Sequence, residues 1–365
     1  MTPRERFEAA LRQQEVDRLP FWVKVFGASY KMLQPEPWRS MPELELAEYL
    51  DLDHYAGAGA PVRTTNERVR ATSDRTDGRQ TTQYETPDGT MTAANGFDAG
   101  SHSWHPVEFP VKTREDILVA RHLFEGNEFT VDDELVQRGR QRIAEVGERG
   151  SVHTWVGISP LMQLIQHYVG PENTYYFLQD HPDEMEDLIA VMHDERLRFL
   201  KAMLPACPYD WVVSGENTST TLLSPAVFER YCWQHLKDYG ELIVAHGKGH
   251  QLHQCGTLHD LLPKINELPA TVIEAYSSPP IGDTPLSDRT ELAPSMAVIG
   301  GTCANLWLES VEVICETMVR DLKAAGGMRG VVYTSAGVMP PGCPIEKIAQ
   351  VREFARGVTP GTLAS

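Results

Sequence analysis

The chain has 365 residues, 41% of them hydrophobic, which is enough for a substantial core, and its formal net charge of −18 argues against nucleic acid and anionic membrane as partners. It has no stretch of the roughly 18 apolar residues that a membrane span requires, and its six cysteines are too sparse for a disulfide framework. The first residues, "MTPRERFEAALRQQ", contain no apolar core of the kind found in signal peptides, so we do not expect them to act as one. We therefore expect a soluble cytoplasmic protein, and the composition favours an enzyme over a scaffold.

The N-terminal part of the chain predicts a helix, a strand and a small antiparallel sheet. "TPRERFEAALRQQ" predicts a helix over 2–14, with Thr2 as N-cap and Pro3 at the first helical position. A short strand follows in "VDRLPFWVKVFG", after a turn at Pro20. The polar residues 68–92 contain two Asp-Gly turns, which are typical of antiparallel strands. We interpret this segment as an inserted β meander and as a candidate lid.

From about residue 150 short apolar runs alternate with helical patterns such as "SPAVFERYCWQHLKDYGELIVAHG" and "SVEVICETMVRDLKAAGG". Strand followed by helix, repeated, indicates a parallel sheet, and about eight such units would close as a (β/α)8 TIM barrel. Because the chain shows no repeat and no long linker, we expect 1–365 to be one barrel domain. The predicted strands are 151–159, 210–215, 250–255, 270–276, 296–301 and 329–335.

The stretch "HQLHQC" ends in two residues that zinc accepts as ligands. His253 and Cys255 lie two positions apart in a predicted strand, so their side chains share a face. The carboxyl ends of barrel strands carry the chemistry of this fold, and imidazole and thiolate both suit zinc. A catalytic zinc takes three protein ligands, however, so a buried histidine beside an inert cysteine is the alternative interpretation of this bare pattern.

Other polar and aromatic residues also lie near predicted strand ends. Glu216 and Asn217 follow "DWVVSG" and are candidates to contact substrate or metal. Glu274 lies in an apolar strand, where burial would raise its pKa and suit it to proton transfer, with an ion pair as the alternative. No Gly-x-Gly-x-x-Gly follows a strand, so a nucleotide cofactor is not expected. Three aromatic residues are candidates for a substrate pocket, with core packing as the alternative: Trp155, Tyr276 and Trp307.

Seven segments, in order along nearly the whole chain, share the pattern of one known superfamily. They are "RERFEAALRQQEVDRLPFW", "QLIQHYVGPENTYYFLQDHPDEMEDLI", "LLSPAVFERY", "HGKGHQLHQCGTLHDLLPKI", "IEAYSSPPIGDTPL", "VIGGTCANLWL" and "PPGCPIEKI". These segments resemble the uroporphyrinogen decarboxylase superfamily, and the resemblance implies a (β/α)8 barrel and one of two activities. One branch consists of decarboxylases that need no metal; the other consists of zinc-dependent methyltransferases that pass methyl groups to or from corrinoid proteins, thiols or small substrates.

The motifs of the two branches favour methyl transfer. The methyltransferase branch uses a His-x-Cys pair, which His253 and Cys255 match, together with a distant cysteine near the last strands. The decarboxylase branch carries an arginine-rich segment after the first strand, where this chain has "FWVKVFGASY" with Lys24 alone. A substrate with many carboxylates would meet a chain of net charge −18 without that cationic clamp.

The sequence does not identify the third zinc ligand. In the methyltransferases the distant cysteine precedes a glycine, and in "TSAGVMPPGCPIEKI" that position is Ala336, before Gly337. Cys343, seven residues later, is the first candidate for the third ligand. Glu216 and Cys303 are the others, and the absence of zinc is the remaining alternative.

The resemblance therefore implies a zinc-dependent methyltransferase or demethylase that moves a methyl group between a small methylated substrate and a corrinoid protein or thiol. Zn2+ would be held by His253, Cys255 and Cys343, with Glu216 and Glu274 as catalytic residues, and the corrinoid would be supplied by a partner protein. A homodimer is left open. The alternatives are a uroporphyrinogen decarboxylase-like decarboxylase and a non-catalytic ligand-binding or regulatory barrel of the same superfamily.

Overall fold

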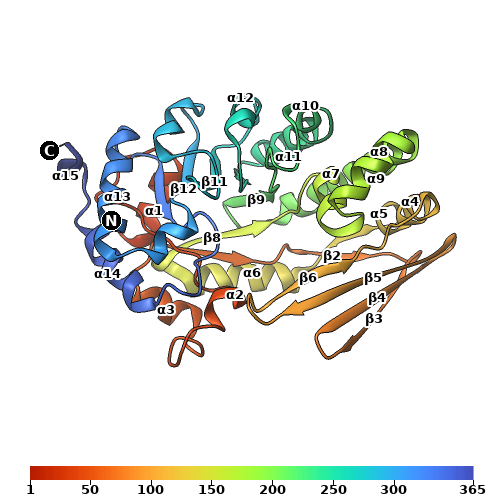
Figure 1. Cartoon of the computed structure of the whole chain (residues 1–365), viewed down its shortest axis with the longest axis horizontal. Coiled ribbons are helices and arrows are strands. Elements are labelled where there is room, and N and C mark those ends of the chain that lie inside the picture. The colour runs from red at the N-terminus through yellow and green to blue at the C-terminus, as the bar shows by residue number, and fades with distance from the viewer. Residues whose placement is uncertain (365) are drawn as a thin grey trace.

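A computed structural model describes residues 1–364, and the centre of this described chain is a seven-stranded parallel sheet (Figure 1). Its strands follow one another in chain order, and each neighbouring pair is parallel. Most are short runs of buried apolar residues, the pattern of a sheet covered on both faces. In sheet order they are β1 (His54–Ala58), β8 (Gly150–Trp155), β9 (Trp211–Gly215), β10 (Gly249–His253), β11 (Val272–Tyr276), β12 (Ala297–Gly301) and β13 (Val331–Thr334).

The segment around Phe21 bonds to both edges of this sheet. On one side the Trp22 N–H donates to the carbonyl of Tyr333 at 3.1 Å, and the Tyr333 N–H donates to the carbonyl of Pro20 at 2.9 Å. On the other side the Asp53 N–H donates to the carbonyl of Phe21 at 2.9 Å. Tyr333 lies in β13 and Asp53 directly precedes β1, so this segment links the first and last strands of a curled sheet.

Buried charges fix the same segment to helix α1 (Pro3–Leu11). The Asp53 carboxylate has no exposed surface; it accepts the Phe21 N–H at 2.9 Å and pairs with Arg6 of α1 at 2.5 Å. Arg18 and Arg352 lie 3.9 and 4.0 Å from it. Three guanidinium groups around one buried carboxylate thus join the N-terminal helix, the bridging segment and the C-terminal part of the chain.

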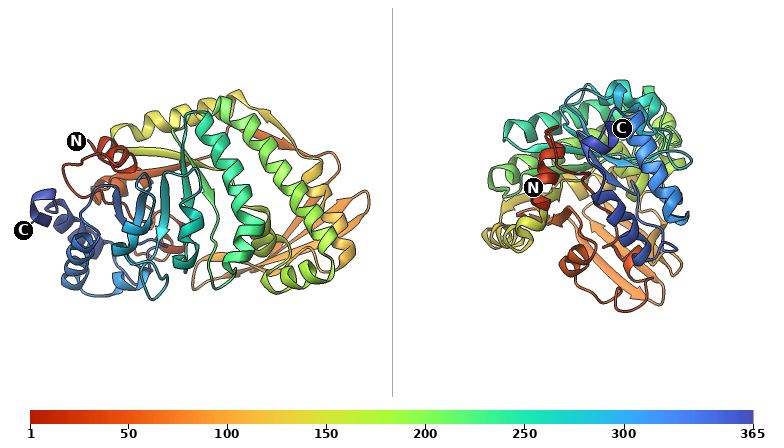
Figure 2. Two further views of the ribbon diagram at one scale, coloured as in Figure 1. Left: turned by 90° about the horizontal axis from the view of Figure 1, so that it is seen from above. Right: turned by 90° about the vertical axis from the view of Figure 1, so that its left-hand side faces the viewer.

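Helices cover the sheet, and several of them begin at a residue whose side chain caps the first turn. The Thr2 hydroxyl accepts the Glu5 N–H at 3.2 Å in a capping box, and Ser224 and Ser310 cap the two helices predicted after them. α9 and α11 lie side by side (Figure 2, left). The longer helices are α3 (Glu43–Tyr49), α4 (Arg114–Ala120), α6 (Asp133–Val146), α8 (Pro171–Asp180), α9 (Pro182–Met203), α11 (Gln234–Ala245), α13 (Val311–Ala324) and α14 (Ile345–Arg356). The shorter ones are α2 (Ala28–Lys31), α5 (His122–Glu125), α7 (Pro160–Gln163), α10 (Pro225–Phe228), α12 (Leu262–Ile265) and α15 (Pro360–Ala364).

A separate antiparallel sheet extends to one side of the parallel sheet, with β3 as its outermost strand (Figure 1). Met91 on its buried face belongs to a second apolar core with α4 and α9. The predicted meander over 68–92 is therefore present as strands, and it continues beyond the predicted end. The strands are β3 (Arg70–Thr76), β4 (Arg79–Thr86), β5 (Gly89–Asp98) and β6 (Ser103–Glu108), and a further pair joins β2 (Val62–Thr65) to β7 (Glu128–Val131).

The predicted α/β class and parallel sheet are confirmed, and each of the six strands predicted from residue 151 onward overlaps an observed one. The short strand predicted in "VDRLPFWVKVFG" was wrong: this segment is irregular, and Phe21 forms an isolated bridge with Tyr333. β1 was not predicted, and β10 ends at His253, two residues before Cys255, instead of at 255. None of the helices in the described part of the chain has the length and apolar character needed to cross a membrane.

Candidate active site

His253 and Glu274 face each other on neighbouring strands. The register of β10 and β11 pairs these two residues directly, and Nδ1 of His253 forms a hydrogen-bonded ion pair with Oε2 of Glu274. Strand register alone therefore brings the imidazole and the carboxylate together at the carboxyl end of the sheet. Because Nδ1 is engaged by Glu274, Nε2 is the ring nitrogen that remains for a substrate or a metal.

Lys24 extends this pair into a chain of charges. Its Nζ forms an ion pair with Oε1 of Glu274 and donates to the carbonyl of Ala336 at 2.7 Å. Burial favours the neutral carboxyl, but the charges of His253 and Lys24 lower the pKa of Glu274 to about 2. Burial also opposes the imidazolium, but Glu274 and a hydrogen bond with Cys255 raise the pKa of His253 to about 9. At neutral pH two cations therefore surround one buried carboxylate.

Cys255 lies just beyond β10, beside this array. Its Sγ donates to Oδ1 of Asn217 at 3.1 Å, and the Asn217 amide donates to Gln166 at 3.3 Å. Asn217 has a φ of 52°, a left-handed conformation that asparagine tolerates better than most residues. All six cysteines lie in the described chain, and Cys255 is the one that is not buried. The predicted neighbours His253, Cys255 and Asn217 are therefore brought together.

Aromatic rings form one wall beside His253. Trp155, at the end of β8, is 45% exposed, and its ring lies edge-on with its centroid 5.3 Å from that of His253. Its indole N–H donates to Nε2 of His153 at 3.1 Å, and burial lowers the pKa of His153 to about 4, so that this imidazole is neutral. The ring of Tyr55 packs against His153 in a tilted arrangement, with the two ring centroids 4.1 Å apart. A Cβ at Gly215 would lie 2.6 Å from the Trp155 ring, so a residue without a side chain is needed there.

Glu216 is turned toward a different element. Its carboxylate accepts the Ser159 N–H at 2.8 Å and a hydrogen bond from the Ser159 hydroxyl, at the start of α7. The residue has no exposed surface, and burial raises its pKa to about 7 against the lowering effect of Ser159. Its backbone N–H donates to the carbonyl of His253 at 2.8 Å. Glu216 therefore holds the backbone near the site, while its carboxylate bonds to the α7 side.

Two predicted aromatic site residues belong to the core instead of a pocket wall. Tyr276 and Trp307 have no exposed surface and lie in the main apolar cluster. The Trp307 indole N–H donates to the Thr302 hydroxyl at 3.0 Å, which satisfies its one polar atom inside the core. Core packing, the alternative named for both residues, is the role that their burial supports.

The described residues do not complete a three-ligand zinc site at His253 and Cys255. Cys343 is buried in the main core, where its Sγ lies 3.9 Å from the carbonyl of Pro344, and Cys303 is buried as well. Ala336, at the position of the expected third cysteine, has no thiol. Among residues 1–364 the one group of three histidine, cysteine or acidic side chains with ligand atoms within 4.8 Å of each other is elsewhere: His259, Asp288 and Glu291.

His253 and Cys255 have one feature of a zinc site but lack others. Glu274 on the second nitrogen of His253 is the kind of outer partner that zinc-bound histidines have. Two protein ligands fall short of the three that catalytic zinc sites use, however, and zinc at Nε2 would have to displace the proton that this nitrogen carries in the imidazolium. The residues present therefore do not fit a catalytic zinc.

Lys24 and His153 are site residues that the sequence did not single out. A signal was present for both, since each interrupts a run of apolar residues: Lys24 in "FWVKVFG" between the buried Val23 and Val25, and His153 in "SVHTW". A charged or polar side chain among buried strand residues must find a partner. The partners of Lys24 and His153 lie on distant segments of the chain, so the sequence alone could not identify them.

His250, on the same strand as His253, supplies a test of stability against pH. It is fully buried between the Ser214 hydroxyl at 3.0 Å and the carbonyl of Pro269 at 3.2 Å, and burial lowers its pKa to about 4. Between pH 6.5 and 4 the unfolded chain takes up the proton that the folded chain refuses, so stability is lost as the pH falls. Urea unfolding should show that His250→Gln reduces the loss between pH 7 and pH 5 by about 2 kcal/mol. An unchanged pH dependence would show that His250 is not held neutral.

Comparison with solved structures shows the fold. A methyltransferase from Methanosarcina mazei is 14% identical, with 97% of this chain and 98% of that chain covered and a TM-score of 0.57. A putative vitamin-B12 independent methionine synthase from Listeria monocytogenes is 13% identical over 63% of this chain and 70% of that one, with a TM-score of 0.38. The IolI protein with a bound zinc atom is 9% identical over 60% and 90%, with a TM-score of 0.28. The last two scores are too low to support an argument.

Sequence comparison gives the family. No curated protein matches the chain significantly. The model of the uroporphyrinogen decarboxylase (URO-D) family matches residues 158–358, which is more than half of the chain and includes β9 to β13 with His253, Cys255 and Glu274. The matched region and the parallel sheet agree with the segments that resemble this superfamily, and the chain belongs to the uroporphyrinogen decarboxylase family.

Proposed function

We propose that the chain is a methyltransferase that moves a methyl group between a small methylated compound and a corrinoid protein or thiol, without a zinc ion at His253 and Cys255. The observation that carries the proposal is the imidazolium of His253, which is held by Glu274 and lies beside an accessible thiol and an exposed tryptophan. Lys24 pairs with the other oxygen of Glu274. The proposal includes closure of the sheet as a (β/α)8 barrel through the segment around Phe21, with this array at its mouth. The likeness in fold to a methyltransferase supports the same activity.

His253 is the proposed general acid. An external nucleophile, a reduced corrinoid or a thiolate, attacks the methyl carbon of the substrate, and the bond between that carbon and an oxygen or nitrogen breaks. The bonding electron pair goes to the leaving heteroatom, which takes the proton from Nε2 of His253, and solvent then returns a proton to the imidazole. Glu274 holds the ring by Nδ1 and stabilises its charge, which is the role of an orienting carboxylate.

The other residues bind and position. Trp155 presents an apolar, partly exposed face next to the acid, suited to a methylated aromatic or aliphatic group. Asn217 and Cys255, which bond to each other beside the array, offer weak polar contacts. Lys24 keeps Glu274 ionised. Glu216 is a positioning residue in this scheme, because its carboxylate bonds to Ser159 and not to the array.

The family name also suggests decarboxylation. Both cations of the array, Lys24 and His253, are already paired with Glu274, so neither is free to act as a clamp for several carboxylates. The direct test follows a deuterated methyl group from a panel of methoxy and methylamine compounds to a small thiol by mass spectrometry. Labelled thioether supports the proposal. Carbon dioxide release from carboxylated compounds without label transfer would favour a decarboxylase, and no turnover would favour a ligand-binding barrel.

Metal content separates the proposed mechanism from the zinc-dependent one. Freshly purified, unchelated protein should contain well under one zinc per chain, and Cys343→Ser should not change that content, since Cys343 is buried in the core. Ala336→Cys should raise it toward one, because Ala336 lies beside the array through its bond to Lys24 and occupies the position of the family's third cysteine. Atomic absorption would measure the zinc content of the unaltered protein and of the two variants. Stoichiometric zinc in the unaltered protein, lost in His253→Ala, would contradict the metal-free mechanism.

A further inference from the structure

The two edges of the antiparallel sheet differ in how open they are. The β6 edge carries Pro106, and the register of β5 and β6 shifts at Ala94 and Asn95. A proline and a bulge are features that prevent further strand pairing. β3 has neither. It has β4 as its one neighbour in the described chain, an unbroken register with it, and seven residues that are all exposed.

Hairpin geometry shows which backbone groups of β3 are free. The two-residue turn at Asp77 and Gly78 closes on Thr76 and Arg79, and the closing pair of such a hairpin is a hydrogen-bonded one. Because hydrogen-bonded and non-hydrogen-bonded pairs alternate, the even-numbered residues of β3 bond to β4. The N–H and C=O groups of three odd-numbered residues therefore point outward, away from the sheet: Ala71, Ser73 and Arg75.

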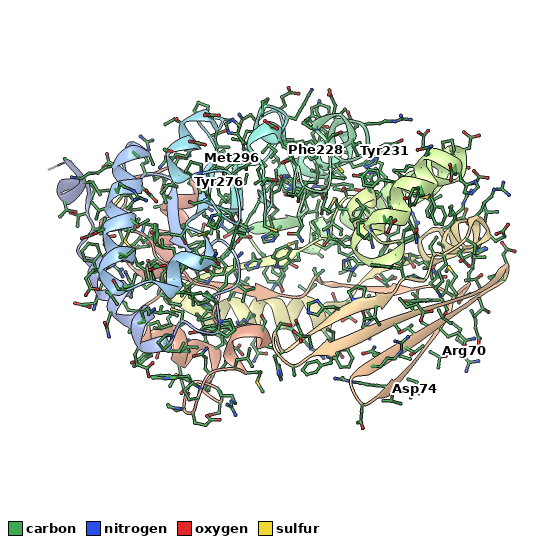
Figure 3. All side chains as sticks on the ribbon, in the orientation of Figure 1. Arg70, Asp74, Phe228, Tyr231, Tyr276 and Met296 are labelled. Atoms are coloured by element: carbon green, nitrogen blue, oxygen red, sulfur yellow. The ribbon has the colours of Figure 1, made fainter. Side chains whose placement is uncertain are left out.

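Two charged side chains on this edge have no partner. Arg70 and Asp74 lie four residues apart, so their side chains share one face of β3. Neither forms an ion pair or a side-chain hydrogen bond with any residue from 1 to 364, and Figure 3 shows both on the outermost strand. If a second copy of this edge is turned by 180° and placed beside the first, the positive charge of each copy comes near the negative charge of the other. The edge is therefore complementary to itself.

We propose that β3 pairs with β3 of a second copy of this chain, antiparallel and about a two-fold axis through Ser73. Ser73 then faces Ser73 of the second copy, and Ala71 faces Arg75, so that the free groups form about six backbone hydrogen bonds. Asp74 lies diagonally opposite Arg70 of the second copy, within reach for an ion pair, and symmetry makes this contact twice. The two sheets become one sheet of eight strands.

The second copy is favoured over another occupant by this self-complementarity. A two-fold contact pairs the β3 edges of both copies with each other, so no β3 edge is left for a third copy and the assembly stops at a dimer. Most homo-oligomers have closed symmetry of this kind. Pairing β3 with β6 of another copy would leave an edge open and would meet Pro106. Two chains of net charge −18 repel at long range, but that repulsion is screened beyond about 8 Å at physiological ionic strength. The contact is smaller than an obligate interface, so the dimer should be reversible.

Sedimentation velocity in about 0.15 M salt, from about 1 to 200 µM protein, tests the contact. The unaltered chain should form a dimer as concentration rises. Asp74→Arg should weaken it about tenfold or more, because two ion pairs become repulsive, and the exchanged variant Arg70→Asp/Asp74→Arg should recover it to within about threefold. Glu316→Arg, an equal charge change at an exposed, unpaired position on α13, should have no effect. A monomer throughout, or a dimer indifferent to Asp74→Arg, would overturn the proposal.

Cross-linking tests the register independently of charge. Facing residues of a hydrogen-bonded pair have Cα atoms about 5.5 Å apart, which is within the range of a disulfide. Under mild oxidation Ser73→Cys should therefore form a disulfide between the cysteines at position 73 of the two copies. Ala71→Cys places the two thiols about 13 Å apart by strand rise and should not link. Peptide mapping distinguishes these links from any through Cys255. Equal linking at both positions, or none at position 73 in a dimer, would contradict the two-fold axis at Ser73.

Discussion

Replacement of His253 by glutamine should lower kcat/KM for methyl transfer by about 10²- to 10⁴-fold, the usual contribution of a general acid. The glutamine amide can still donate a hydrogen bond to Glu274 but cannot deliver a proton to the leaving heteroatom. The loss should fall mainly on kcat, since the proton moves in the transition state and Trp155 and Asn217 remain to bind substrate. Steady-state kinetics with the deuterated donor that gives the best signal would measure it.

The matched control is His250→Gln, the same substitution three residues earlier on the same strand. His250 bonds to Ser214 and Pro269 and makes no contact with Glu274, so this variant should keep kcat/KM while it alters stability in acid. Equal activity losses in the two variants would show that disturbance of β10, and not loss of the acid, accounts for the effect. Full activity of His253→Gln would remove the proposed role of His253.

Asp53→Asn should lower the free energy of unfolding by about 3–5 kcal/mol, the cost of breaking a buried ion pair from one side. Burial raises the pKa of Asp53 to about 6 although Arg6 and Arg18 lower it, so the carboxylate is charged at pH 7 and balances the guanidinium groups around it. The variant leaves Arg6 and Arg352, both almost fully buried, without that charge. It also weakens the bond to the Phe21 N–H that holds the bridging segment.

Urea unfolding followed by circular dichroism at pH 7 would give this difference. Asp187→Asn is the control, because Asp187 pairs with Arg121 at 3.6 Å on the surface with its side chain 72% exposed, and such pairs contribute about 0–1 kcal/mol. A loss below about 1 kcal/mol in Asp53→Asn would show that the network contributes no more than a surface pair.

The sheet could be predicted because its strands are local features of the sequence. "DWVVSG" and "ATVIEAY" are apolar runs between helical patterns, and both lie within two residues of the observed β9 and β11. β1 was missed because "HYAGA" contains no β-branched residue and reads as a loop. Its place in the sheet comes from pairing with β8, a contact between residues about 100 positions apart.

The array at the site depends on such distant contacts as well. His253 could be predicted as a site residue from its place at a strand end, but its pairing with Glu274 follows from the register of two strands, and the bond to Lys24 follows from the path of the N-terminal segment. Cys343 shows the same limit. Cys343 lies seven residues after Ala336 in the sequence, so it could have reached the metal if the loop between them folded inward. In the structure the residue packs into the core instead, and its carbonyl accepts the Tyr30 hydroxyl at 2.7 Å.

The most direct test of the proposed methyl transfer is the absorption spectrum of reduced cobalamin mixed with the enzyme and each methoxy or methylamine compound of the panel. The proposal predicts conversion of the cob(I)alamin bands to those of methylcobalamin with at least one compound, at a rate that requires the enzyme and is unaffected by a zinc chelator. The same reaction should be about 10²-fold slower or more with His253→Gln. No methylcobalamin with any donor, together with no methyl transfer to thiols, would contradict a methyltransferase; methylcobalamin formation that the chelator abolishes would contradict the metal-free mechanism.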